Sequence, residues 1–200
     1  ALTEPLSCTV HGIEESNIKA GDMVVVNGAG PIGLMFVALA RLKGAVVIST
    51  DLSDERLRYA KDFGADYIIN ATNVSDQVDA VKELTEDGKG VDVAIEASGS
   101  PKVWEMTILM GRKGATINLF GGCQSGTSIS IDTKLLHYSE LTIRGVYHHS
   151  PYYVKKAFKL ITTGQIDAAK FVTADMPLEN LVEALELMGQ QKGIKYNITT

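Results

Sequence analysis

Short runs of apolar and β-branched residues alternate with longer amphipathic stretches along most of the chain. The apolar runs predict buried strands, and the amphipathic stretches between them predict helices. We predict strands over residues 23–27, 45–50, 67–70, 91–97, 115–120 and 141–146. We predict helices over residues 31–43, 53–63, 74–86 and 101–110. This alternation indicates βαβ units and a parallel sheet, that is, an α/β doubly wound fold.

The pattern changes after Pro151, where two further helices are predicted over residues 153–163 and 178–188. The second carries an i, i+3, i+4, i+7 stripe of Leu178, Leu181, Val182, Leu185 and Met188. A stripe of this kind is typical of a helix packed on a core, and we prefer that interpretation to an interface role. Residues 194–200 are a candidate strand that needs a partner from elsewhere in the chain.

Composition and charge exclude several classes of protein. Hydrophobic residues make up 45% of the chain and charged residues 22%, which is ordinary for a globular protein. The longest apolar runs, such as residues 34–40, are far shorter than the roughly 20 residues that a bilayer-spanning helix needs. The formal net charge of -5 disfavours nucleic acid, whose recognition relies on clustered Lys and Arg. We therefore expect neither a membrane nor a nucleic-acid partner.

The two cysteines, Cys8 and Cys123, lie outside any CxxC or Cys/His spacing. Neither a disulfide framework nor a self-contained zinc finger is indicated. The chain opens on Ala1, in a stretch without the basic flank and apolar core of a signal peptide. We therefore expect a reducing, cytoplasmic location, and we expect the sequence to be a piece of a longer protein.

The first predicted strand ends in Gly28-Ala29-Gly30-Pro31-Ile32-Gly33, a GxGxxG motif at a strand-to-helix junction. In such a motif Gly28 permits the tight turn, Gly30 has no Cβ to block a pyrophosphate, and Gly33 lets the helix pack close to the strand. The helix N-terminus then presents unpaired N–H groups and a partial positive charge to the anion. Alone, the motif is also compatible with an ordinary glycine-rich turn.

Asp51 ends the second predicted strand, 18 positions after Gly33. An acid about 20 residues beyond the glycines completes the dinucleotide-binding pattern, so we predict a Rossmann fold with a six-stranded parallel sheet. A carboxylate there accepts hydrogen bonds from the adenosine ribose and repels a 2′-phosphate, which favours NAD over NADP. The alternative is that Asp51 caps the helix that follows Ser53. Arg56 either lies over the adenine or forms a surface ion pair, and spacing does not choose between these.

Further motifs extend this pattern across the chain: Glu4-Pro5-Leu6-Ser7, Ile18-Lys19-Ala20-Gly21-Asp22, Arg56-Leu57 with Ala60, Gly64-Ala65-Asp66, Gly90-Val91-Asp92, Glu96-Ala97-Ser98-Gly99, Gly145 and Ile194-Lys195. With the glycine motif and Asp51, they make the sequence resemble the zinc-dependent medium-chain dehydrogenases. Within that superfamily it is most similar to the polyol, sorbitol and threonine dehydrogenase branch.

The resemblance implies a two-domain parent enzyme, of which this chain is the coenzyme-binding part. Residues 1–21 would connect from a missing N-terminal catalytic domain, residues 22–150 would form the NAD-binding domain, and residues 151–200 would return toward the catalytic domain and pack on it. The Cys and His that ligate the catalytic zinc would lie in the missing part. Glu4 matches the acid that ligates or approaches that zinc, but one carboxylate cannot hold a metal. We therefore expect the chain alone to be inactive.

The resemblance also implies a set of NAD contacts. The matching positions are Gly28, Gly30, Pro31, Ile32 and Gly33 at the pyrophosphate, Asp51 and Arg56 at the adenosine, Leu119, Phe120 and Gly121 beside the nicotinamide ribose, and Val146 and Tyr147 at the next strand end. Ser98 is a further predicted coenzyme contact. Most of these positions lie at the carboxyl ends of strands, where open α/β sheets bind ligands. The resemblance places Cys8 in the lining of the nicotinamide pocket.

His148-His149 is a candidate metal-binding pair. Adjacent residues on a strand point to opposite faces, so we expect that both cannot easily ligate one ion. We interpret Cys8 and Cys123 as packing residues rather than nucleophiles, because neither has a histidine partner in the sequence.

The resemblance, together with the dinucleotide-binding pattern, implies a zinc- and NAD-dependent alcohol or polyol dehydrogenase that transfers hydride from a secondary alcohol to NAD. We expect it to form a dimer or tetramer, because family members commonly pair through the edge strand at residues 141–146. One alternative is a non-catalytic nucleotide-sensing module with the same fold. A second is a zinc-free quinone reductase relative that uses NADPH, which Asp51 and Glu4 both oppose.

Overall fold

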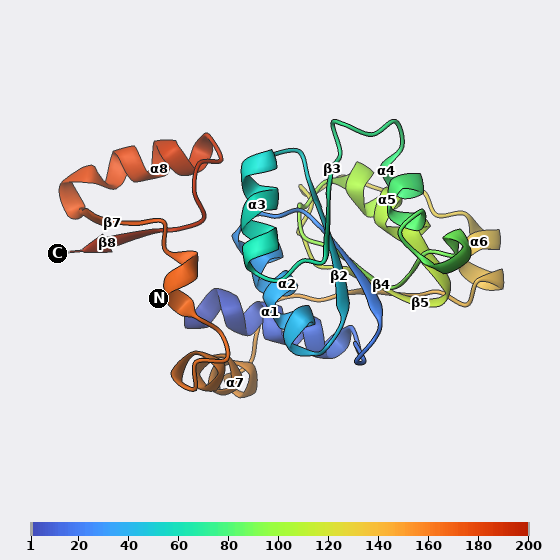
Figure 1. The fold of residues 1–200 in the computed structure, drawn as a ribbon, viewed down its shortest axis with the longest axis horizontal. Helices are drawn as coiled ribbons and strands as arrows, with labels where there is room; N and C mark the ends of the chain where they lie inside the picture. The colour runs from blue at the N-terminus through green and yellow to red at the C-terminus, as the bar shows by residue number, and fades with distance from the viewer. Residues whose placement is uncertain (1, 200) are drawn as a thin grey trace.

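The computed structural model describes residues 2–199, and its centre is a six-stranded parallel sheet (Figure 1). The strand order is β3-β2-β1-β4-β5-β6, which is the Rossmann order and confirms the predicted fold class. The strands are β1 (Met23–Asn27), β2 (Val46–Asp51), β3 (Tyr67–Asn70), β4 (Val91–Glu96), β5 (Gly111–Leu119) and β6 (Thr142–Gly145). The order reverses between β1 and β4, so a crevice opens at the carboxyl ends of these two strands.

Helices cover both faces of the sheet. One face carries α1 (Thr3–Glu15), α2 (Pro31–Leu42), α3 (Asp54–Asp62) and α7 (Pro151–Thr162). The other carries α4 (Gln77–Lys82), α5 (Pro101–Met110) and α6 (Thr133–Tyr138). Within β1, Val24 and Val26 join the core on the first face and Val25 joins the core on the second. This alternation explains why a strand buried on both sides shows a continuous apolar run.

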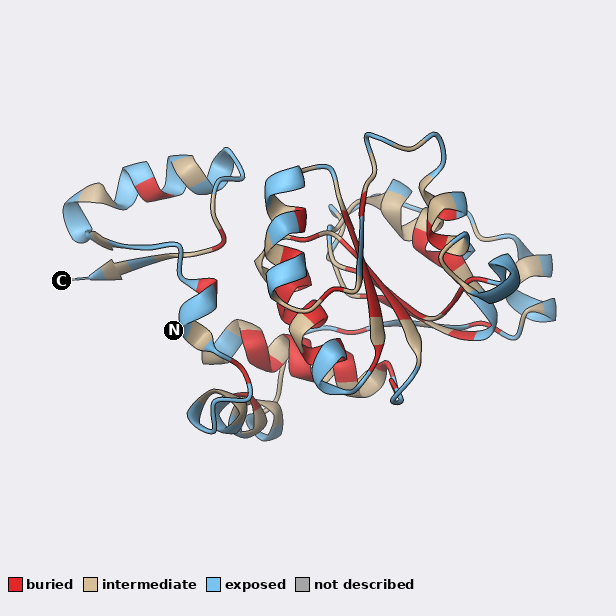
Figure 2. Ribbon diagram, viewed as in Figure 1, coloured by how far each residue is buried: buried red, intermediate tan, exposed pale blue. Residues whose placement is uncertain are grey.

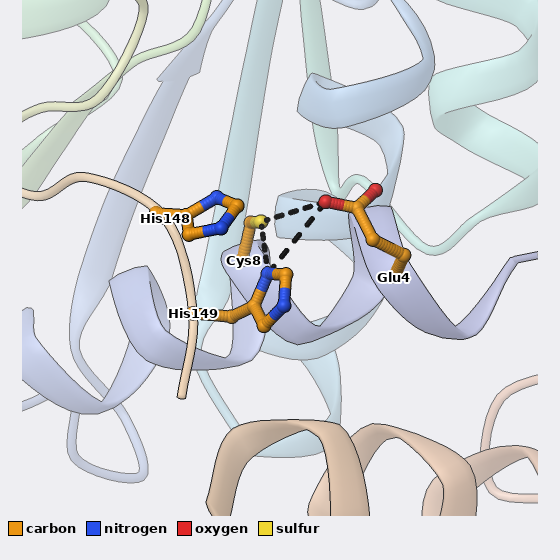
Figure 3. A group of neighbouring side chains, drawn as sticks. All are labelled: Glu4, Cys8, His148 and His149. Carbon is orange, nitrogen blue, oxygen red and sulfur yellow. Dashed lines mark hydrogen bonds and ion pairs between the residues drawn. The ribbon is translucent and has the colours of Figure 1, made fainter. Parts of the chain in front are cut away.

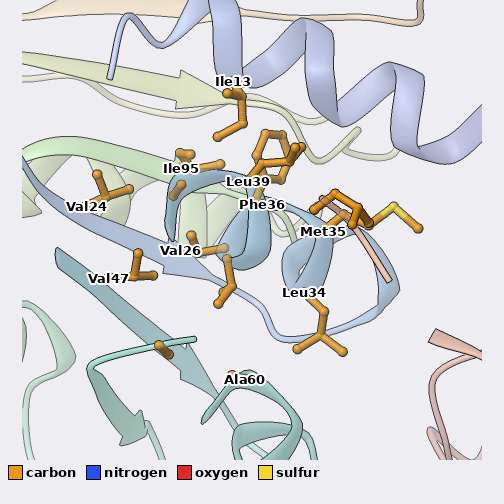
Figure 4. Packing of buried hydrophobic residues seen from close by; sticks show 14 of the residues in the cluster. Ile13, Val24, Val26, Leu34, Met35, Phe36, Leu39, Val47, Ala60 and Ile95 are labelled. Atoms are coloured by element: carbon orange, nitrogen blue, oxygen red, sulfur yellow. The ribbon is translucent and has the colours of Figure 1, made fainter. Parts of the chain in front are cut away.

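The core between the sheet and α2 is the larger of the two, and Figure 4 shows part of it. Phe36 of α2 is fully buried, with its ring edge-on to Phe120 at 4.8 Å between centroids. Ile13 of α1 reaches the same cluster. The residues expected to connect from another domain thus include a helix, α1, that contributes Leu6, Val10 and Ile13 to the core.

The last part of the chain forms a smaller unit. It contains the 3-10 turns η2 (Ala168–Phe171) and η3 (Leu178–Asn180), the helix α8 (Leu181–Gly189), and the strands β7 (Ala174–Pro177) and β8 (Tyr196–Thr199). The candidate strand at residues 194–200 finds its partner in β7, with which β8 pairs in parallel over residues 196–199. Residue 200 lies outside the described residues.

The expectation that the α8 stripe packs on a core is wrong for this chain. Leu178, Leu181, Val182, Leu185 and Met188 are all exposed, between 40% and 66%. Only Ala184 of that helix is buried, and Figure 2 shows α8 as mainly exposed or half-buried. The apolar stripe is present on the surface, but no other described part of the chain covers it.

Several predicted boundaries need correction. The helix predicted over 74–86 is shorter, because Asp76 caps α4 by accepting from the amides of Val78 and Asp79. After α4, residues 86–88 form the 3-10 turn η1 (Glu86–Gly88) instead of the end of the predicted helix. α1 and α6 lie in segments for which no helix was predicted. Within residues 2–199, no helix has the length and apolar character to cross a membrane.

Candidate coenzyme cleft and side-chain cluster

The glycine motif forms the turn from β1 into α2. Gly28 has φ +102, a backbone conformation that glycine adopts without strain. A Cβ on Gly33 would collide with the carbonyl oxygen of Gly28, so only glycine lets α2 pack this close to the strand end. The nearest heavy atom to a Cβ on Gly30 would be Nη1 of Arg56, 3.9 Å away. Gly30 therefore faces open space at the N-terminus of α2, and Pro31 follows as the first residue of that helix.

Asp51 stands against this loop. Its Oδ2 accepts a hydrogen bond from the amide of Ala29 at 2.7 Å, and its Oδ1 accepts from the amide of Ser53 at 3.0 Å. The residue that caps α3 is Ser53, whose side chain accepts from the amide of Arg56. Asp51 thus links the end of β2 to the glycine loop and is not the helix cap. A carboxylate offers about four acceptor positions, so two remain for a ligand.

A cleft of about 410 Å³ opens beside the loop. It is lined by six of the predicted coenzyme contacts, Gly28, Gly30, Pro31, Asp51, Arg56 and Ser98, together with Asn27, Thr50, Leu52, Ala71, Gln77, Ala97, Ser100, Val103 and Gln191. The strand ends of β1, β2 and β4 thus meet at one cavity, as the topology requires. Within the described part of the chain, Nε of Arg56 is buried without a hydrogen-bond partner. A buried donor of this kind indicates a missing acceptor, such as an anionic ligand.

The floor of the cleft is a polar network that the sequence did not reveal. Asn27 is fully buried, and its Oδ1 accepts from Thr50 Oγ1 at 2.7 Å and from Gln77 Nε2 at 3.0 Å. Its Nδ2 donates to Thr107 Oγ1 at 2.8 Å. Because every side-chain polar atom of Asn27 is paired, the network fixes the ends of β1 and β2 relative to each other. The only signal in the sequence was a polar residue closing an apolar strand.

The positions expected near the nicotinamide lie beyond this cleft. Phe120 and Gly121 follow β5, and their amides both donate to the carbonyl oxygen of Glu96 at the end of β4. A Cβ on Gly121 would lie 2.5 Å from Glu96 Oε2, so the close approach of the chain to Glu96 at this point also requires glycine. The structure does not bring the remaining positions into the cleft. Leu119 and Val146 are buried, Ile32 is half-buried, and Tyr147 is 90% exposed.

Glu96 is the one fully buried carboxyl group among the described residues. Its Oε1 accepts from the amides of Ser98 and Gly99 at 2.7 and 3.0 Å, and from the Ser98 hydroxyl. Burial raises the pKa of Glu96 above its ordinary value, although the hydrogen bonds from Ser98 and Gly99 oppose the shift. Glu96 therefore organises the turn after β4, on which Ser98 stands.

A second group of polar side chains lies between α1 and the loop after β6: Glu4, Cys8, His148 and His149 (Figure 3). Cys8 Sγ is 3.4 Å from His149 Nδ1 and 3.6 Å from Glu4 Oε1. His149 Nδ1 is 3.6 Å from Glu4 Oε1. Burial and the neighbouring Glu4 carboxylate raise the pKa of the Cys8 thiol.

The structure corrects the premises of two expectations about these residues. β6 ends at Gly145, so His148 and His149 are not adjacent strand residues on opposite faces. His148 has φ +63, which turns the backbone and brings both rings to one side. Cys8 does have a histidine partner, but that partner lies 141 residues later in the sequence. Cys123 is a free thiol away from this group.

Comparison with known proteins identifies the family. A family described as zinc-binding dehydrogenase matches residues 31–163, from the first turn of α2 through the end of α7. The chain belongs to the zinc-binding dehydrogenase family. This finding confirms the resemblance that the sequence motifs indicated.

Relatives of this zinc-binding dehydrogenase chain include polyol and diol enzymes. The sorbitol dehydrogenase of Halalkalibacterium halodurans is 34% identical over 204 residues, covering 100% of this chain and 58% of its own length. The (R,R)-butanediol dehydrogenase of Neisseria gonorrhoeae is 36% identical, over 91% of this chain and 50% of its own length. The chain thus spans about half the length of the curated relatives it matches.

Solved structures of other dehydrogenases have the same fold as this chain. A zinc-binding dehydrogenase from Sinorhizobium meliloti, solved with NADP, superposes with a TM-score of 0.90 at 28% identity. The superposition covers 99% of this chain and 58% of that one.

The family implies zinc, and the donor atoms present here fit it. Thiolate sulfur, imidazole nitrogen and carboxylate oxygen are the three kinds of ligand that zinc takes from proteins. Cys8, His149 and Glu4 supply one of each within 3.6 Å of one another. Sequence reasoning considered Glu4 and the His148-His149 pair separately and took Cys8 as a packing residue, because nothing in the sequence brings residue 8 next to residue 149.

Proposed function

We propose that this chain is the NAD-binding domain of a zinc-dependent alcohol or polyol dehydrogenase, which oxidises a secondary alcohol or polyol by hydride transfer to NAD. The observation that carries the proposal is the position of Asp51. Its carboxylate lies 2.7 Å from the Ala29 amide, so an acid at the end of β2 faces the glycine loop across a shared cleft.

Different residues of the cleft would bind different parts of the coenzyme. Gly30 and the N-terminus of α2 would hold the pyrophosphate, because no Cβ intervenes there and the helix dipole is positive at that end. The guanidinium of Arg56 lies beside Gly30, and its unpartnered buried Nε donates toward the ligand. Asp51 keeps two acceptor positions for the hydroxyls of the adenosine ribose. A 2′-phosphate would meet this carboxylate as a like charge, which favours NAD over NADP.

The strand ends beyond the cleft would set the orientation of the nicotinamide ring. The turns at Ser98 and Phe120-Gly121, held by hydrogen bonds to Glu96, would border the nicotinamide half of the coenzyme. NAD accepts the hydride, and zinc, when bound, polarises the alcohol oxygen as a Lewis acid. What this domain supplies is the orientation of the coenzyme.

The substrate class rests on the names of the relatives, which are polyol and diol dehydrogenases. Because the chain spans about half their length, we propose that it does not turn over alcohol by itself. We propose a dimer or tetramer for the parent enzyme, paired through β6. Two free thiols fit a reducing cytoplasm.

Calorimetric titration with NAD and with NADP tests the proposal. We expect tighter binding of NAD, whereas tighter binding of NADP would overturn the assigned role of Asp51. Asp51→Ala should weaken NAD binding about 10- to 100-fold, because a charge-assisted hydrogen bond is lost, and should weaken NADP binding much less. Asp62→Ala, at an exposed position on α3, is the matched control. If Asp51→Ala weakened the binding of NAD and NADP equally, the carboxylate would serve only to hold the turn and not to bind the ribose.

The inactivity of the chain is tested separately. Incubation with NAD, zinc and sorbitol or butanediol should produce no NADH above a protein-free control. Sustained NADH production by the pure chain would contradict this part of the proposal.

A further inference from the structure

The group of Glu4, Cys8, His148 and His149 is built from two distant parts of the chain. Glu4 and Cys8 are four residues apart on α1, so they project from the same side of that helix. The two histidines come from the loop between β6 and α7. One ligand atom from each of the four residues lies within 4.8 Å of all the others. Figure 3 shows Cys8 between the two imidazole rings, with the Glu4 carboxylate closing one side.

The separations among Glu4, Cys8 and His149 match those of a tetrahedral metal site. Zinc binds sulfur at about 2.3 Å and nitrogen or oxygen at about 2.0 Å, so ligand atoms around one tetrahedral ion lie roughly 3.3 to 3.6 Å apart. The separations among Cys8 Sγ, His149 Nδ1 and Glu4 Oε1 are 3.4, 3.6 and 3.6 Å. An ion can therefore sit between these atoms with little movement of the side chains.

The loop that carries the histidines is held in place from behind. A ring nitrogen of His11, one turn further along α1, hydrogen-bonds the carbonyl oxygen of His148 at 2.9 Å. The His11 ring stacks on Tyr153 of α7, 4.4 Å between centroids. His148 itself has φ +63, a conformation that costs free energy in a residue with a side chain. These contacts fix the loop on α1 and keep His149 over Cys8, as supporting residues do around metal ligands.

We propose that Glu4 Oε1, Cys8 Sγ and His149 Nδ1 bind one Zn²⁺ ion within this chain. The proposal deepens the zinc part of the proposed function and does not depend on the NAD cleft. One soft, one intermediate and one hard donor suit zinc, whereas Mg²⁺ and Ca²⁺ take oxygen ligands. Three protein ligands leave one tetrahedral position open, as in zinc sites that perform chemistry. Glu4 opens the site to solvent, since its side chain is 62% exposed against 20% for His149.

Cobalt binding tests the proposal without measuring any enzyme activity. The 200-residue chain, free of any histidine tag, is titrated with Co²⁺ under reducing conditions. We expect one equivalent to bind, with a near-ultraviolet thiolate-to-cobalt charge-transfer band and the strong visible bands of four-coordinate cobalt. Addition of one equivalent of Zn²⁺ should remove both sets of bands. Absence of the charge-transfer band in the wild-type chain would overturn the proposal.

Paired variants assign the ligands. Cys8→Ser should abolish the charge-transfer band, and Cys123→Ser, at the other free thiol, should keep it. His149→Ala should weaken zinc affinity on the order of 100-fold or more, measured by competition with a chromophoric chelator, whereas His137→Ala should not. Survival of the band in Cys8→Ser would contradict the assignment.

Glu4→Gln covers the case in which a variant at Cys8 or His149 fails to fold. Its side chain is mostly exposed, so the fold should persist, as circular dichroism can verify, while zinc affinity falls at least about tenfold. Unchanged affinity in a folded Glu4→Gln would contradict a three-ligand site. NAD titration of the same samples separates the two proposals. Cobalt binding without NAD binding would refute only the coenzyme assignment, and NAD binding without cobalt binding would refute only the zinc site.

Discussion

The coenzyme cleft and the side-chain cluster on α1 are assembled in opposite ways. The acid and the glycines of the cleft fall within residues 28–51, on one βαβ unit whose geometry is repeated in every fold of this class. The cluster joins Cys8 to His149 across 141 residues, through the packing of α1 and the turn of one loop. A site formed within one structural unit can be recognised in the sequence by the spacing of its residues. A site formed by the packing of distant segments has no such spacing.

The two regions also differ in burial. The cleft rests on Asn27, Thr50 and Glu96, which are buried and hydrogen-bonded inside the sheet. The cluster lies at the surface, where Glu4 is exposed and Cys8 is half-buried. Substitutions below the cleft should therefore change the stability of the whole domain, and substitutions in the cluster should change metal affinity with little effect on stability.

The largest effect is expected for Gly33→Ala. Its Cβ would collide with the backbone carbonyl of Gly28, which cannot move without separating α2 from the sheet. We expect a loss of about 3 kcal/mol or more in the free energy of unfolding, and loss of NAD binding. Urea unfolding followed by circular dichroism measures the first. Gly189→Ala, where a Cβ meets open space, is the control and should stay within about 0.5 kcal/mol of the wild type.

A smaller loss is expected for Asn27→Ala. The substitution removes the acceptor of the buried Thr50 hydroxyl, and a buried donor left unpaired costs about 1–3 kcal/mol. Gln77 and Thr107 lose one partner each but keep hydrogen bonds to Thr50 and to the carbonyl oxygen of Val103. The urea midpoint should fall accordingly. Asn197→Ala, which breaks an exposed hydrogen bond to Asp175, should change it little. Equal effects at the two positions would show that the network does not support the cleft.

Glu96→Gln should change how stability depends on pH. Burial raises the pKa of Glu96, so the folded protein holds this proton at pH values where the unfolded chain has released it. Stability from this group is therefore greatest below the ordinary pKa of glutamate and declines as pH rises toward the raised value. Gln cannot ionise, so the variant should gain stability relative to the wild type as pH rises from the ordinary pKa of glutamate toward the raised value. A difference in urea midpoint between the two proteins that stays constant across this pH range would contradict a raised pKa of Glu96.

The smallest effect is expected for Glu4→Gln measured with a chelator present. Glu4 is exposed in the first turn of α1, where its charge interacts favourably with the helix dipole by a few tenths of a kcal/mol. We expect a change within about 0.5 kcal/mol in the free energy of unfolding. A loss above about 1 kcal/mol would mean that the cluster stabilises the fold without metal.

The sequence predicted the sheet well, because strands buried on both faces are continuous apolar runs bounded by turns. Residues 23–27 and 67–70 match β1 and β3 at both ends. It did not predict α1, whose apolar Leu6, Val10 and Ile13 are separated by small and polar residues that are also buried. The stripe on α8 predicted a buried face that this chain does not bury, since periodicity shows that a face is apolar and not what covers it.

Of the candidate sites, Gly28, Gly30 and Asp51 followed from spacing because each answers a local constraint on one turn. The Asn27 network and the Cys8–His149 contact did not, because they depend on which side chains meet once the layers have packed.

Amide chemical shifts measured during titration with NADH test the central claim most directly. The amides of Ala29, Gly30 and Ser53 border the proposed pyrophosphate and ribose positions, so their signals should move progressively and saturate with a common affinity. Gly126, in the loop before α6, should not move. Saturable shifts confined to residues away from the glycine loop, or no shifts at all, would contradict the assignment of this cleft to the coenzyme.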